Sequence, residues 1–190
     1  MRHSVLLLAA LTLLGTVPLN AQSAIGDDQT PITVHAVKHG ETVTVDAEFT
    51  VAVPPKLAWE VLTDFAHMSN FISNVKFSSV TEQHGNKLRV AQKGAAKHGP
   101  ISFSFDSIRE IELVPTEKIS SHVLSGSMKK LDGTTLLRAD GSGTRVVYHA
   151  ESIPNTYVPP VIGTTFIENE SRHQFEEMRI EMLKRQSAAP

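Results

Sequence analysis

The sequence predicts an α+β fold in which a curved antiparallel sheet of about seven strands packs against one long C-terminal helix. Apolar and polar residues alternate strictly over 41–53, which indicates a half-buried strand. A period of two returns after two short helical stretches and continues for about seventy residues. Residues 161–185 then carry apolar side chains at helical spacing, which indicates one long helix. The 190 residues are enough for one domain with its own core.

The first strand and the two short helices follow one another directly. Residues 43, 45, 47, 49, 51 and 53 are all apolar and share one face of the strand. Pro54 and Pro55 end it and lead into a helix over 56–65, since proline is favoured in a first helical turn. A second helical turn is expected over 66–71.

Alternating segments cover much of the region between these helices and the last one. The periodicity indicates strands at 88–93, 101–113, 119–128, 131–139 and 144–152. The phase of the second segment shifts near Ser107, where we expect a bulge or a strong bend. Lys129-Lys130 and the glycine-rich stretch 140–143 are expected to form hairpin turns.

The last helix carries one mostly apolar stripe, formed by Ile167, Ser171, Phe175, Met178 and Met182. A single helix about 10 Å across does not easily fill the hollow of a strongly curved sheet, so we expect a cavity between the two. Met178 and Met182 have flexible side chains that suit a ligand-facing wall. The same stripe is also compatible with ordinary core packing.

The N-terminus differs in kind from the rest of the chain. Arg2 precedes an apolar run over 5–14, and small residues follow at 21–24, as in a secretory signal peptide. The run is too short to span a bilayer, which needs about 20 residues. We therefore expect residues 1–21 to be a signal peptide cleaved near Ala21, 22–40 a flexible arm, and 41–186 the folded domain of a periplasmic or secreted protein without a transmembrane anchor.

Composition excludes several other classes of function. The chain has no cysteine, which rules out disulfides, thiolate metal sites and cysteine nucleophiles. Its net charge of −2 argues against a nucleic-acid partner. Neither a phosphate-binding loop nor a metal-binding histidine motif occurs, and we expect no cofactor. His149 and Glu151 share a strand face, where a solvent-facing role is favoured over metal ligation.

Several weak motifs together resemble the START-like, or SRPBCC, superfamily, especially its polyketide cyclase/dehydrase and coenzyme-Q-binding START branches. They are the segment 54–72 with its PPKLAWEVLTDF opening, 119–129, 143–148 and 158–160, and the resemblance spans about 41–186. It implies a helix-grip (Bet v 1/START-like) fold with a cavity for hydrophobic molecules such as lipids, isoprenoids, quinones or polyketides. Members with a signal peptide resemble periplasmic proteins.

The side chains expected on the inward faces of the strands and of the last helix are those expected to contact a ligand. They are Phe71, Ile72, Phe103, Phe105, Val123, Leu137, Tyr148, Ile167, Phe175 and Met178. Tyr148 is the candidate acid or base if the protein is an enzyme, because it shares an inward face with Val146 and Ala150. Arg138 has the opposite parity to its neighbour Leu137, which points it to solvent.

Three functions remain open at this level. The first is an exported binding or carrier protein for a hydrophobic small molecule, without covalent chemistry. The second is a polyketide cyclase or dehydratase that uses the same cavity. The third is a periplasmic accessory protein that binds an unidentified partner enzyme. Lys129 and Lys130 at a hairpin tip would add a transient membrane contact, although a solvated turn is the simpler interpretation.

Overall fold

The computed structural model describes residues 30–98, 101–155 and 163–189, which form one antiparallel sheet and two α-helices. The strands are β1 (Thr33–His39), β2 (Thr42–Val51), β3 (Val75–His84), β4 (Lys87–His98), β5 (Ile101–Val114), β6 (Lys118–Gly126), β7 (Met128–Asp140) and β8 (Gly143–Pro154). Their order in the sheet is β1-β2-β8-β7-β6-β5-β4-β3. Helix α1 (Pro55–Leu62) and the short 3₁₀ helix η1 (Met68–Asn70) lie between β2 and β3, and α2 (Thr164–Ser187) ends the fold.

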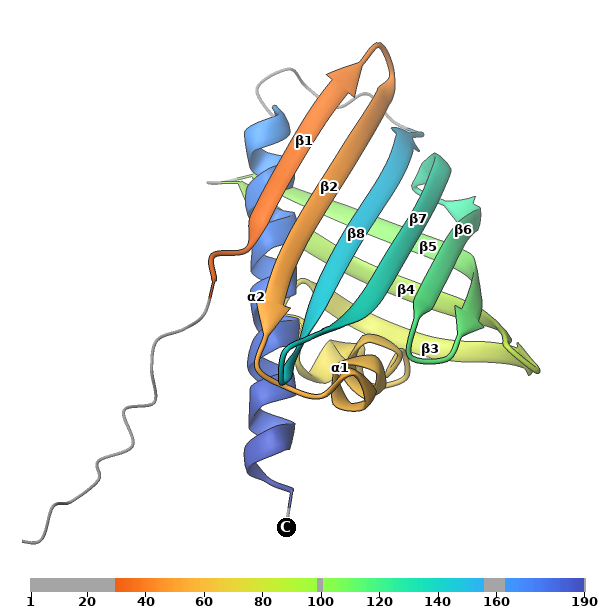
Figure 1. The fold of residues 1–190 in the computed structure, drawn as a ribbon. Coiled ribbons are helices and arrows are strands. Elements are labelled where there is room, and N and C mark those ends of the chain that lie inside the picture. Colours follow the sequence, from red (N-terminus) through yellow and green to blue (C-terminus); the bar gives the residue numbers. More distant parts are fainter. Residues whose placement is uncertain (1–29, 99–100, 156–162, 190) are drawn as a thin grey trace, which may run out of the picture.

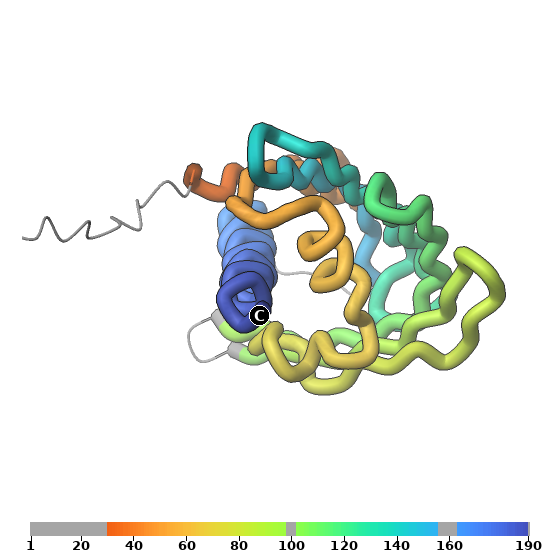
Figure 2. Tube along the Cα trace, turned by 60° about the horizontal axis from the view of Figure 1, so that its bottom comes forward, coloured from red at the N-terminus to blue at the C-terminus, as the bar shows by residue number. Residues whose placement is uncertain are grey.

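The sheet curls around α2, which lies beside the edge strand β1 and approaches the start of the other edge strand, β3 (Figures 1 and 2). Side chains of α2 bind backbone groups on both sides. Glu168 Oε1 accepts a hydrogen bond from the Ala36 amide of β1 at 2.8 Å, and Glu177 Oε2 accepts one from the Ser73 amide at 3.0 Å. The helix thereby satisfies donors at both open sides of the sheet.

Local sequence explains how α1 begins and what it buries. Pro54 is the N-cap and Pro55 opens the helix, in the position where a missing amide hydrogen costs nothing. The buried face of α1 consists of Ala58, Val61 and Leu62. Figure 2 shows the α1–η1 segment, drawn in orange, across the mouth of the curled sheet. This segment therefore covers one end of the sheet's hollow.

The helix-grip fold expected from the sequence is confirmed. One strand, two short helices, a run of strands and a long helix follow in the expected order, although no periodic segment of the sequence indicated β3. The eighth strand is β1, in a segment that the sequence assigns to a flexible arm. Val34 and Ala36 are buried there and β1 pairs with β2 along its whole length, so the arm is wrong for Thr33–His39. Only Val34 and Ala36 alternate as buried residues before the exposed Val37 interrupts the period, so the apolar pattern is too short to indicate a strand.

Two expectations about local breaks are also corrected. The turn expected at Lys129-Lys130 lies at Ser127, and both lysines belong to β7. Strand β5 keeps its phase through Ser107, because Phe105, Ser107, Arg109 and Ile111 all face the interior. The irregularity lies in β6, where Ile108 pairs with Ser125 but Arg109 pairs with Val123.

The expected signal peptide at 1–21 lies outside the described residues, as does the first part of the expected arm, 22–29. Among the helices of the described chain, none has the length and apolarity that a membrane crossing requires.

Candidate functional site

A cavity of about 360 Å³ lies between the concave face of the sheet, the α1–η1 segment and α2. This volume is at the small end of the range for small-molecule sites, about 300–1,000 Å³. Most of its wall is apolar. The apolar lining comes from Leu62, Phe65, Met68, Ile72, Val75, Phe105, Ile111, Ile119, Met128, Leu131, Phe175 and Met178. Such a wall suits a hydrophobic molecule, since apolar surface leaves water on binding.

The structure brings five of the ten predicted ligand residues to this cavity: Ile72, Phe105, Tyr148, Phe175 and Met178. The ring of Phe175 on α2 meets the ring of Tyr148 on β8 edge-on, with 5.2 Å between centroids, and that of Phe49 at 5.6 Å. These contacts connect the helix stripe to the sheet and fix the direction of the Tyr148 ring.

The other five predicted residues pack around the cavity without lining it. Val123 and Leu137 are buried in the core, and Ile167 is half-buried on α2. The ring of Phe103 packs against that of Phe166, with centroids 5.8 Å apart. Phe71 lies under the guanidinium of Arg185, 5.6 Å from it. Parity placed Val123 and Leu137 on the inner face, but neighbouring elements cover that part of it.

A guanidinium lies among the polar groups of this cavity wall. Arg109 on β5 lines the cavity, and its Nη2 donates a hydrogen bond to Oε1 of Gln92 on β4. The Gln92 amide nitrogen in turn donates to Ser78 Oγ at 3.0 Å and approaches Met68 Sδ at 3.2 Å. Burial lowers the pKa of Arg109 from its ordinary value, and the nearby Tyr148 hydroxyl partly offsets this effect.

Tyr148 is the titratable group that faces this cation. Burial raises the pKa of Tyr148 above its ordinary value, and Arg109 opposes the increase. The hydroxyl therefore stays protonated at neutral pH and can donate a hydrogen bond. It lies 3.7 Å from the place where a Cβ on Gly133 of β7 would stand, so the hydroxyl lies beside Gly133 at ordinary contact distance.

Sequence reasoning missed Arg109, Gln92 and Ser121. Continuing the odd-numbered face of β5 from Phe103 through Ser107 would have placed Arg109 inside. The apolar Ile108, on the even-numbered face, indicated a change of phase instead. Arg138 is exposed, as its parity indicated.

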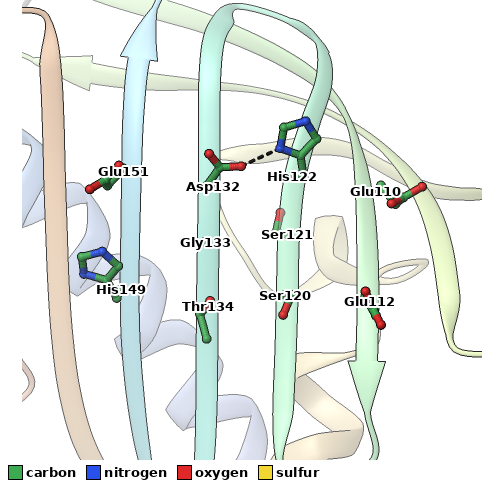
Figure 3. Close-up of a pocket in the computed structure, with 10 residues that line it drawn as sticks. All are labelled: Glu110, Glu112, Ser120, Ser121, His122, Asp132, Gly133, Thr134, His149 and Glu151. Carbon is green, nitrogen blue, oxygen red and sulfur yellow. Dashed lines mark hydrogen bonds and ion pairs between the residues drawn. The ribbon is translucent and has the colours of Figure 1, made fainter.

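A second, shallow hollow lies on the outer face of the sheet (Figure 3). Several of its polar side chains pair with one another or with neighbours. His122 Nδ1 lies 2.5 Å from Asp132 Oδ1, and Lys130 Nζ lies 2.7 Å from Glu151 Oε2. His149 is paired with Asp46 at 2.7 Å, so His149 and Glu151 both lie in salt-bridged surface positions. No group of three potential metal ligands occurs among the described residues.

A curved antiparallel sheet that grips a long helix around an apolar cavity defines the helix-grip class of proteins. Residues 51–179 match the family model for polyketide cyclase/dehydrase and lipid transport proteins, and the chain belongs to this family. Family and fold together indicate a protein for a hydrophobic ligand, as a binder, a lipid transporter or a cyclase. No curated protein matches the sequence.

Solved structures with the same fold come from several bacteria. The chain is similar to the protein TTHA0849 from Thermus thermophilus, with a TM-score of 0.65, 16% identity and coverage of 74% of this chain and 97% of that one. The Zhui aromatase/cyclase from Streptomyces sp. R1128 has a TM-score of 0.64 and 17% identity, with coverage of 76% of this chain and 95% of that one. The STAR-related lipid transfer protein from Xanthomonas axonopodis has a TM-score of 0.65 and 10% identity, with coverage of 80% of this chain and 99% of that one.

Proposed function

We propose that the protein is an exported binding or carrier protein that holds a hydrophobic small molecule, such as a lipid, isoprenoid or quinone, in the cavity between its sheet and α2. The observation that carries this proposal is the cavity itself, with a wall of apolar side chains from α1, η1, the sheet and α2. Filling that space with protein side chains would stabilise the fold, so an unfilled apolar cavity has a cost in packing. Ligand binding offsets such a cost.

Export is part of the proposal and is supported by the N-terminal pattern alone. A basic residue, an apolar run and small residues near Ala21 form the pattern of a secretory signal peptide. N-terminal sequencing of the protein recovered from its own cells tests this part. A mature N-terminus near residue 22 is the expected result, and an intact Met1 on all of the protein contradicts it.

Native mass spectrometry of the protein purified from its own cells tests the binding function. A bound hydrophobic molecule that is released under denaturing conditions is expected. Ser171 lines the cavity from α2, so Ser171→Trp should fill the space and expel the ligand. Ile180 lies on the same helix and is 63% exposed, so Ile180→Trp is the matched control that should keep it. Repeated absence of any ligand from the natural protein would overturn the proposal.

The presence of Tyr148 and Arg109 on the same cavity wall favours a polyketide cyclase or dehydratase as the second candidate. A protonated phenol can act as a general acid, and a neighbouring guanidinium stabilises negative charge that develops on a substrate oxygen. The test is turnover of a linear poly-β-ketone thioester by the wild type and by Tyr148→Phe. Loss of turnover with an unchanged melting temperature is expected for an enzyme. Equal turnover by both proteins would exclude this role for Tyr148.

A further inference from the structure

The cation in the cavity has no carboxylate partner among the described residues. Three other arginines of the described chain each have a carboxylate partner. The pairs are Arg89 with Glu82, Arg145 with Glu48, and Arg185 with Asp64 and Glu181. Arg109 has a hydrogen bond to the neutral amide of Gln92 and forms no ion pair within the described chain. Asp106 also borders the cavity, but its Oδ1 accepts a hydrogen bond from Ser127 Oγ at 2.6 Å. Arg109 therefore has no ion-pair partner within the described chain, and Asp106, whose side chain is exposed, forms none with it.

Arg109 itself and one other residue of the cavity wall carry buried donors without a partner. Within the described part of the chain, Arg109 Nε and Ser121 Oγ are buried and have no hydrogen-bond partner. A buried polar group that remains unpaired destabilises the fold, because it has lost its hydrogen bonds to water. Ser121 pairs in register with Gly133, and the Tyr148 hydroxyl lies over Gly133. Arg109, Ser121 and Tyr148 all line the same cavity. A cation and two hydroxyls thus face one space without an acceptor that neutralises them.

We propose that the ligand is an amphiphile with a single carboxylate, seated against Arg109, Ser121 and Tyr148, with its hydrocarbon tail along Phe105, Phe175 and Met178. This inference rests on the proposed binding function and names the ligand class of that site. A carboxylate has one charge, which matches one guanidinium, and its oxygens accept several hydrogen bonds. A phosphate monoester has a charge of about −1.5 to −2 and would leave part of it buried without a partner.

The test uses three amphiphiles with the same tail: decanoate, decanol and decyl phosphate. The affinity of each is measured at pH 7 by its displacement of the neutral fluorophore N-phenyl-1-naphthylamine from the purified protein. The wild type should bind decanoate at least tenfold more tightly than decanol and more tightly than decyl phosphate. Arg109→Met should abolish the preference for decanoate and leave the affinity for decanol unchanged. Arg138→Met, on the exposed side of β7, is the matched control and should keep the wild-type preference.

The outcomes separate this inference from the function on which it rests. If the fluorophore and all three amphiphiles fail to bind the wild type, the proposed function falls together with the inference. If decanoate and decanol bind equally, or only decyl phosphate binds tightly, the carboxylate is excluded while the binding function stands. The comparison of decanoate with decanol needs no variant, so it decides the question even if Arg109→Met fails to fold.

Discussion

Arg185 Nη2 on the last turn of α2 donates a hydrogen bond to Asp64 Oδ2, just after α1, across 2.8 Å. The same guanidinium holds Glu181 through Nε at 2.9 Å and lies over the ring of Phe71. Asp64 also accepts a contact from His67 Nδ1 at 2.6 Å. This cluster joins α2 to the α1–η1 segment that covers one end of the cavity. The cover and the helix are therefore linked by charge as well as by packing.

We predict that Asp64→Asn destabilises the protein by about 1 kcal/mol at pH 7, at the low end of the range for hydrogen bonds to charged groups because solvent reaches the pair. Burial alone would raise the pKa of Asp64, but the hydrogen bonds from Arg185 and His67 outweigh it and lower that pKa. The stabilisation is thus present above about pH 4 and is lost as the pH falls through the lowered pKa. Urea unfolding at several pH values measures it.

Glu60→Gln on α1 is the control for this substitution. Glu60 is half-exposed and lies 4.0 Å from Lys56, so its loss should change the free energy of unfolding by less than about 0.5 kcal/mol. A difference between wild type and Asp64→Asn that stays constant from pH 7 to pH 2 would contradict the assignment.

The second prediction concerns Phe175, which connects α2 to the sheet. Its side chain is 7% exposed and contacts both Phe49 and Tyr148. Phe175→Ala should lower the free energy of unfolding by about 3 kcal/mol, at the low end for a phenylalanine because one side already faces the cavity. Ile180→Ala on the exposed side of the helix should cost less than about 0.5 kcal/mol. Equal costs in denaturant unfolding would show that Phe175 is not part of the core.

Much of the fold could be predicted from the sequence because its signals are periodic and local. The alternation of β2 and the proline pair before α1 specify both elements, and each is found where it was expected. Strand β1 was not predicted from the sequence, because it is an edge strand with few buried residues. Its position depends on pairing with β2 and on Glu168 of α2, a contact 132 residues away in the chain. Local sequence does not contain that information.

The site was harder to predict than the fold for a related reason. Hydrophobic periodicity identifies Phe105 and Phe175 as inward-facing, but it treats a polar residue on an inner face as a break in the pattern. For this reason Arg109 was not predicted to line the cavity, although it lies on the same face of β5 as Phe105. Packing explains the misplaced residues Val123 and Leu137, since parity gives the face of a strand but not which part of that face remains uncovered.

The third prediction is the titration of Tyr148. The difference in phenolate absorbance between wild type and Tyr148→Phe should show a pKa above about 10, because burial disfavours the ionised form. Because the folded-state pKa lies above the unfolded value, stability should fall as the pH rises from about 10 through the raised pKa, and this contribution is lost above it. Arg109→Met removes the opposing cation and should raise the Tyr148 pKa further. A pKa at or below the ordinary value, or a decrease in Arg109→Met, would contradict the pairing of these groups.

The fourth prediction compares two glycines of the sheet. A Cβ on Gly94 would stand 2.1 Å from the Asn74 carbonyl oxygen and 2.3 Å from Phe105 Cζ, both too close for contact. The Ala95 amide donates to the same Asn74 oxygen at 2.9 Å, so the backbone has little freedom to move away. Gly94→Ala should therefore cost about 1–3 kcal/mol or more.

Gly133→Ala is the matched control for Gly94→Ala, because its Cβ would meet Ala150 Cβ and the Tyr148 hydroxyl at 3.7 Å, which is ordinary contact. It should be neutral or stabilise the protein by up to about 1 kcal/mol through the loss of unfolded-state entropy. Thermal unfolding of both variants measures the difference. Similar melting temperatures would mean that β4 and the residues before β3 are not held as closely as the hydrogen bond from Ala95 to Asn74 indicates, and that the Phe105 side of the cavity wall can shift.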